Sequence, residues 1–144
     1  MNADWLRDAS RANVFHLAGD QRALASAAAS AGLMVVYIDI HHAHDKDDFM
    51  AEATLALRFP EQAGTSWDSF EHGLKDLSWI QAKGWVVILE KSKHFAGGHS
   101  HEFKDAMAAM SAAADHWRAK GKPFWTFVGG PDGWKSGWPD MPSA

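Results

Sequence analysis

Residues 33–40 read Leu-Met-Val-Val-Tyr-Ile-Asp-Ile, an almost uninterrupted apolar run with several β-branched side chains. Such a run predicts a strand that is buried on both faces, as in a parallel sheet covered by helices. Two later runs have the same character, Trp-Val-Val-Ile-Leu at 85–89 and Phe-Trp-Thr-Phe-Val at 124–128. A shorter apolar run at 14–17 is a further candidate strand. Together these runs predict the strands of one sheet.

Helical patterns lie between the predicted strands. Residues 20–32 begin with Asp20, a good N-cap, and residues 45–57 carry acids in the first turn and apolar side chains at helical spacing. A Gly/His-rich loop then leads into the longest helical pattern, at about 100–120. Because strands alternate with helices, we predict an α/β fold with a small, mostly parallel sheet flanked by helices and joined by right-handed connections.

One predicted helix carries much of the negative charge. It begins near Thr65 or Ser66, where Thr65-x-x-Asp68 has the form of a capping box. Its apolar stripe consists of Trp67, Phe70, Leu74 and Leu77. The opposite, solvent-facing side carries Asp68, Glu71, His72, Lys75 and Asp76. The segment 61–80 has a charge of −3 before histidine is counted, which is most of the net charge of the chain.

We expect a single α/β domain over residues 1–128, with a strand-helix unit at 1–32 before a core at 33–128. Residues 129–144 contain four Gly and three Pro, so we expect an irregular tail there. Trp134 and Trp138 in this tail leave two interpretations open. The indoles pack on the domain, or they contact a partner.

The composition is that of a globular protein without disulfides. Of 144 residues, 47% are hydrophobic and 22% are charged, which excludes disorder of the whole chain. The net charge of −4 argues against a binder of nucleic-acid phosphates and favours a basic partner. The absence of Cys excludes thiolate nucleophiles and Cys-based zinc sites. With neither an apolar leader nor a run long enough to cross a membrane, we expect a cytoplasmic protein.

The run Phe59-Pro60-Glu61-x-x-Gly64-x-x-Trp67-Asp68-x-Phe70-x-x-x-Leu74 resembles the barstar family of intracellular ribonuclease inhibitors. The order of predicted elements over 33–128 agrees with that resemblance. It implies a small parallel sheet flanked by helices and an inhibitory surface formed by the charged helix and the loop before it. It also implies a basic ribonuclease or ribonuclease toxin as the partner, whose substrate groove the carboxylates would fill. No metal, cofactor, direct nucleic-acid contact or chemistry of its own is implied.

The resemblance assigns partner-binding roles to individual residues. Asp68 matches the first acidic position on the inhibitory helix of the family. The second acidic position falls on His72, and an aromatic pair in the loop falls on Gln62 and Ala63, so the chain departs from the family there. The predicted partner-binding residues are Asp68, His72, Glu71, Asp76, Gln62 and Gly64. A purely structural interpretation stays open, in which Asp68 stabilises the first turn and Glu71 pairs with Lys75.

Nine histidines suggest an alternative function. Six lie in two clusters, His41-His42-x-His44 and His94-x4-His99-x-His101, each directly after a predicted strand. In a parallel sheet both clusters lie at the carboxyl edge, where open α/β folds place ligands. Imidazoles there could hold zinc at His41, His42, His99 or His101 and make a metal-binding or hydrolytic domain of the same fold. The spacings match no known zinc motif.

Other enzyme classes lack support in the sequence. The motifs G-x-S-x-G, G-x-x-x-x-G-K-[ST] and G-x-G-x-x-G are absent. Asp68, His72 and Asp76 form a ladder at helical spacing with His72 between two acids, but Ser69 is turned about 60° away from His72 on a helix. We therefore predict that the protein is not an enzyme.

Overall fold

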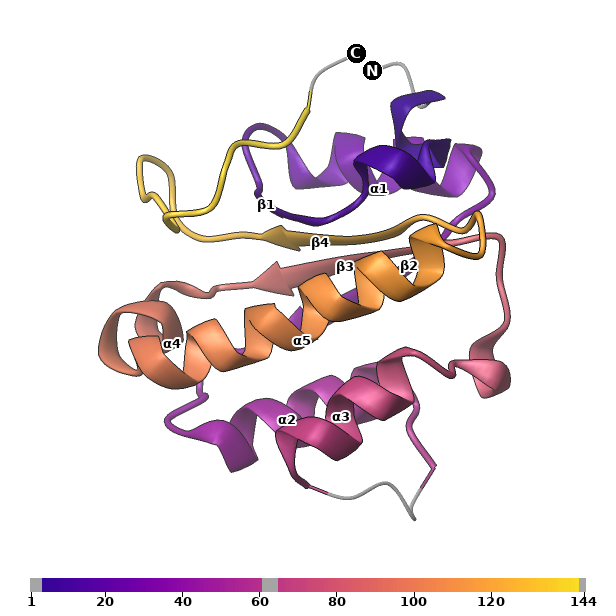
Figure 1. Ribbon diagram of the computed structural model, residues 1–144. Helices are drawn as coiled ribbons and strands as arrows, with labels where there is room; N and C mark the ends of the chain where they lie inside the picture. The colour runs from indigo at the N-terminus through magenta and orange to yellow at the C-terminus, as the bar shows by residue number, and fades with distance from the viewer. Residues whose placement is uncertain (1–3, 61–64, 143–144) are drawn as a thin grey trace.

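The computed structural model describes residues 4–60 and 65–142 and contains a four-stranded, all-parallel sheet. The order across the sheet is β1-β4-β3-β2 (Figure 1). The strands are β1 (Val14–His16), β2 (Met34–Asp39), β3 (Trp85–Glu90) and β4 (Phe124–Val128). The predicted α/β class and the parallel sheet are confirmed.

Helices cover both faces of this sheet (Figure 1). Helix α1 (Gln21–Ser30) and the short turns η1 (Asp4–Arg7) and η2 (Ala9–Arg11) lie on one face. Helices α2 (Lys46–Ala56), α3 (Trp67–Leu74) and α5 (Ser100–Arg118) pack on the other, where α2 contacts β2 and α3 contacts α5. The remaining elements are η3 (Ser78–Ile80) and α4 (Lys93–Gly98).

Short polar side chains fix where three of the helices begin. Asp20 accepts a hydrogen bond from the backbone of Arg22 at the start of α1, and Asp45 caps α2. At α3 the cap is Ser66, whose hydroxyl accepts from the backbone N–H of Ser69 at 3.1 Å. The capping pair is therefore one residue later than the predicted Thr65-x-x-Asp68. Each such cap stabilises its helix by about 1 kcal/mol.

Two predictions about individual elements are wrong. The run at 33–40 was expected to be buried on both faces, but β2 is an edge strand and Tyr37 is 47% exposed. Only β3 and β4 lie inside the sheet, and their side chains are almost all buried. The expected Gly/His-rich loop after β3 contains the short helix α4, despite Gly97 and Gly98.

The tail packs along the outer edge of β1. The backbone N–H of His16 donates to the carbonyl of Pro139, and the N–H of Met141 donates to the carbonyl of His16. Trp134 and Trp138 are partly buried against the hydrophobic core. The structure thus supports the interpretation in which the indoles pack on the domain.

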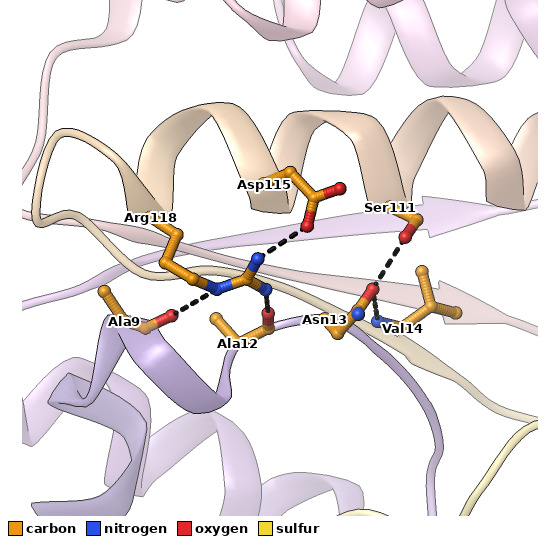
Figure 2. A network of polar contacts seen from close by, with 7 residues as sticks. All are labelled: Ala9, Ala12, Asn13, Val14, Ser111, Asp115 and Arg118. Atoms are coloured by element: carbon orange, nitrogen blue, oxygen red, sulfur yellow. Dashed lines mark hydrogen bonds and ion pairs between the residues drawn. The ribbon is translucent and has the colours of Figure 1, made fainter.

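A polar seam joins the N-terminal segment to α5 (Figure 2). The guanidinium of Arg118 donates to the carbonyls of Ala9 and Ala12 and to the carboxylate of Asp115. About two helical turns before Arg118, the hydroxyl of Ser111 donates to the side-chain oxygen of Asn13 at 2.9 Å. Residues before β1 are therefore held by the helix that precedes β4.

Candidate functional site: the exposed side of α3

Helix α3 is fixed to the body through one side and leaves its charged side in solvent. Phe70 and Leu74 are buried, whereas Asp68 and His72 are exposed. The indole N–H of Trp117 in α5 donates to the carbonyl of Leu74 at 2.8 Å. This bond satisfies a carbonyl in the last turn of α3 and fixes that end of the helix on α5.

Gly73 lets an aromatic ring lie directly against α3. A Cβ atom at this position would lie 2.4 Å from Cε2 of Phe59, closer than real carbon contacts. The Phe59 ring also stacks on Phe70, with centroids 5.7 Å apart, and meets Trp79 at 5.3 Å. The chain just before residues 61–64 is thereby anchored to the helix just after them. In the sequence Gly73 stands out as a glycine inside a predicted helix, and the structure places it in the last turn of α3. The sequence does not identify the ring that packs against it.

The charges on the exposed side are partly compensated. Lys75 lies 2.9 Å from the carboxylate of Glu71, and both side chains are more than one third exposed. This i,i+4 pair contributes only about 0.3–0.5 kcal/mol, as in the structural interpretation. Asp68 lies in the first turn of α3, where the helix dipole favours a carboxylate. Among the described residues no ion pair involves Asp68, so its charge faces solvent.

His116 of α5 lies beside the end of α3. Burial is the largest cause that lowers the pKa of this imidazole below the ordinary value of 6.5, and the positive charges of Lys120 and Lys75 lower it further. A backbone hydrogen bond at Lys75 acts in the opposite direction. Because its pKa is lowered, His116 carries less positive charge at neutral pH than an ordinary histidine and so dilutes the negative charge of α3 less.

The structure brings four of the predicted partner-binding residues to one surface. Asp68, Glu71, His72 and Asp76 lie on or just after α3, and Gln62 and Gly64 lie outside the described residues. The predicted ladder is wrong in one respect, because α3 ends at Leu74 and Asp76 follows its last turn. Within the described part of the chain, no ion pair joins His72 to either acid.

A cavity of about 790 Å³ lies elsewhere, at the carboxyl ends of β1, β3 and β4. The loop after β1, the loop after β3 and the tail line it. Its position agrees with the edge at which parallel sheets bind ligands. The acidic side of α3 belongs to a different part of the molecule.

The histidine clusters meet only in part. His44, His94 and His99 come together, whereas His41 pairs with Asp39 and His101 lies near Asp105. The ring of His42 lies against that of His41, tilted by 43°. Of the four histidines expected to hold zinc, only His99 is in the group.

The fold is a small α/β domain with an all-parallel sheet covered by helices, and α3 gives it an exposed acidic side. The family model Barstar (barnase inhibitor) matches residues 33–129, which run from just before β2 to just after β4. The chain belongs to the barstar family, as the resemblance predicted. Membership supports the role of a ribonuclease inhibitor at the level of the family, whose members are inhibitors and not enzymes. The comparison with curated proteins finds no match.

In residues 4–60 and 65–142, no helix combines the length and the apolar character that crossing a bilayer requires.

Proposed function

We propose that this protein inhibits a basic ribonuclease by covering its substrate groove with the exposed side of α3 and the loop before it. In this proposal it acts in the cytoplasm, either on a ribonuclease of the same cell or as an immunity protein against a ribonuclease toxin. It is not itself an enzyme and contacts no nucleic acid. The observation that carries the proposal is Asp68, an exposed acid without an ion pair among the described residues, on a helix within the family match.

Electrostatics explains why an acidic helix suits this partner. A ribonuclease groove is lined by cations that bind RNA phosphates, and carboxylates held on a rigid helix can occupy the same positions. Opposite charge also speeds the encounter of the two proteins, and salt reduces that effect. Because α3 is fixed on α5 through the Trp117–Leu74 bond, little order has to be gained on binding.

The departures from the family point to a partner that differs from barnase itself. His72 stands at the second acidic position, and Gln62 at one of the aromatic loop positions. The charge that remains on α3 is concentrated at its two ends, with Asp68 in the first turn and Asp76 after the last. We therefore expect selectivity among basic ribonucleases.

The test is a titration of the untagged protein into assays of several small basic ribonucleases. We expect one of them to lose activity in proportion to added protein, with an end point at equal amounts. Cleavage of RNA by the protein alone, or undiminished activity of every ribonuclease at excess protein, would contradict the proposal.

Asp68→Asn tests the assigned surface against such a ribonuclease. Removing this charge should weaken inhibition by roughly 2 kcal/mol, about thirtyfold in Kd, as for a charged hot spot at an interface. The fold should lose at most about 1 kcal/mol, since Ser66 and not Asp68 caps the helix.

The matched control is Asp132→Asn, which removes an exposed carboxylate from the tail. It changes the net charge equally and should leave the inhibition constant unchanged. Equal losses in both variants would mean that α3 is not the binding surface.

A further inference from the structure

Three imidazoles from separate parts of the sequence converge at one end of the sheet. His44 lies in the turn between β2 and α2, His94 lies in α4, and His99 lies between α4 and α5. One ring nitrogen from each lies within 4.8 Å of the other two. We infer that His44, His94 and His99 form a binding site for a divalent transition-metal ion of the zinc type. This inference does not depend on the proposed inhibition.

The nitrogen separations are close to those that a bound ion needs. Nε2 of His94 lies 3.2 Å from Nδ1 of His44. Two nitrogens at about 2.0–2.1 Å from a tetrahedral zinc ion lie about 3.3–3.4 Å apart, so this pair already has the required spacing. The ring of His99 lies 5.9 Å from that of His94 and 6.3 Å from that of His44, centroid to centroid. One ring nitrogen of His99 lies within 4.8 Å of the other two, which completes the three-nitrogen set.

The fold holds the backbone of His44 in place before any ion binds. The N–H of His44 donates to a carboxylate oxygen of Asp48 at 3.0 Å, and the N–H of Asp48 donates to the carboxylate of Asp45 at 2.8 Å. These bonds tie the turn to the start of α2. The group of possible ligands found among the described residues consists of the three histidines, without a carboxylate.

The other two ligands are held by the core beneath α4. The N–H of His99 donates to the carbonyl of Phe95, and the carbonyl of His99 accepts from the N–H of Phe103, both at 2.9 Å. Phe95 is fully buried and stacks on Phe49 of α2, with centroids 5.6 Å apart. This aromatic pair keeps α4 next to α2 and so keeps His94 and His99 close to His44.

The donor set indicates the class of ion. Three neutral imidazoles suit Zn²⁺, Cu²⁺, Ni²⁺ and Co²⁺, whereas Ca²⁺ and Mg²⁺ require oxygen ligands. His44 and His94 are exposed and His99 is half-buried, so a fourth coordination position would face solvent. A neutral ligand set leaves the charge of the ion uncompensated. Because Zn²⁺ accepts three imidazoles and a solvent molecule as ligands, it is the ion used in the experiment.

The experiment measures Zn²⁺ binding by calorimetry on untagged, chelator-treated protein at neutral pH. We expect one ion per chain. Replacing one ligand, as in His44→Ala or His94→Ala, should weaken that binding by at least about 10- to 100-fold, since even outer-shell changes have effects of that size. His41→Ala and His101→Ala are the matched controls, because they remove an exposed histidine from the same two segments and should leave the affinity unchanged.

Co²⁺ provides a second measurement that reports the ligands directly. The Co²⁺-loaded protein should show visible absorption bands of a nitrogen-ligated ion, and these bands should be lost in His94→Ala and retained in His101→Ala. Circular dichroism checks that each variant is folded. Zn²⁺ affinity that is the same in the wild type and in the triple variant His44→Ala, His94→Ala, His99→Ala would overturn the proposal. So would an equal loss of affinity in the control variants.

Discussion

Gly73 is unfavourable for the helix α3 by propensity, but its lack of a side chain is required by the packing around it. On a free helix Gly73→Ala would stabilise by about 1 kcal/mol. Here the new methyl would lie 2.4 Å from the Phe59 ring, which Phe70 and Trp79 hold in place. Overpacking of this kind destabilises by about 1–3 kcal/mol, so we expect Gly73→Ala to lower the free energy of unfolding in urea by about 1 kcal/mol.

The ring itself provides the control for this prediction. In a Phe59→Ala background the methyl of Gly73→Ala has room, and the same substitution should become neutral or stabilising. If Gly73→Ala lowers stability equally with and without the Phe59 ring, the contact does not explain the glycine.

His116 predicts a pH dependence of stability. Its pKa in the folded protein lies below 6.5 because burial and the nearby lysines disfavour the imidazolium. When the pH falls below about 6.5, the unfolded chain therefore binds a proton that the folded protein does not, and folding becomes less favourable. Above that pH the residue has no such effect, because it is neutral in both states.

We expect His116→Gln to lose less stability than the wild type between pH 7 and pH 5, as measured by urea denaturation. The two carboxyl groups with lowered pKa values, Asp8 and Asp39, have an ordinary value of 3.8 and titrate below this window. His101→Gln, on the exposed start of α5, is the control and should behave like the wild type. If the free energy of unfolding falls equally with pH in the wild type and in His116→Gln, His116 does not cause the pH dependence.

At the scale of elements, one side chain of α5 holds the segment before β1. Arg118 donates to the carbonyls of both Ala9 and Ala12 (Figure 2). Arg118→Ala leaves these two carbonyls without a charged donor, and we expect it to lower the free energy of unfolding by about 1–3 kcal/mol. Arg118→Lys should restore only part of this, because a single ammonium lacks the fork that reaches two carbonyls. Faster hydrogen exchange at residues 12–14 would locate the effect.

Arg11→Ala is the comparison for Arg118→Ala, because Arg11 is an exposed arginine of η2, in the same part of the fold. It should change stability little. A loss for Arg11→Ala as large as that for Arg118→Ala would mean that charge alone, and not the seam, stabilises this region.

Elements differed in how far the sequence could predict them. The strands at 85–89 and 124–128 were predicted within a residue because burial on both faces leaves no charged side chain in either run. The same apolar character misled at 33–40, because strand order depends on contacts between distant segments and places β2 at the edge. Helix α4 was missed because Gly97 and Gly98 disfavour a helix that the buried Phe95 nevertheless anchors.

In the candidate sites, too, local patterns could be predicted from the sequence and contacts between distant segments could not. The exposed side of α3 could be predicted because helical spacing alone places Asp68 and His72 opposite Phe70. The histidines could be assigned to the correct edge of the sheet, but their grouping depends on the Phe49–Phe95 stack. Such a contact leaves no periodic trace in the sequence.

At the scale of the whole molecule, the family match and the folded unit do not coincide. The match begins at residue 33, after β1 and α1. Yet the N-terminal segment covers the sheet face that carries Trp125 and Phe127, and the indole N–H of Trp125 donates to the carbonyl of Leu6. We propose that residues 1–128 form one domain. By this we mean that residues 33–128 do not fold without residues 1–32.

We therefore expect the fragment 33–129 to be unfolded or aggregated. It would expose Val86, Ile88, Trp125 and Phe127, all fully buried in the full chain. Each such side chain contributes about 1.5–3 kcal/mol on burial, and the sum is comparable with the whole stability of a domain. Near-ultraviolet circular dichroism and thermal unfolding of the fragment beside the full chain make the test. A cooperative transition in the fragment would contradict it.

The tail that lies along β1 leaves the sheet with two unequal edges. On one side, Pro139 and Met141 occupy the backbone groups of His16, whereas no strand of the described chain lies beyond β2 on the other. Backbone groups at an uncovered border are the template for adding a foreign strand. Among the described strands, only β2 has an open edge to which a strand of another copy can be added. Two copies that pair their β2 strands around a two-fold axis therefore have no open edge left. Assembly by this route stops at a pair and does not continue into a fibre.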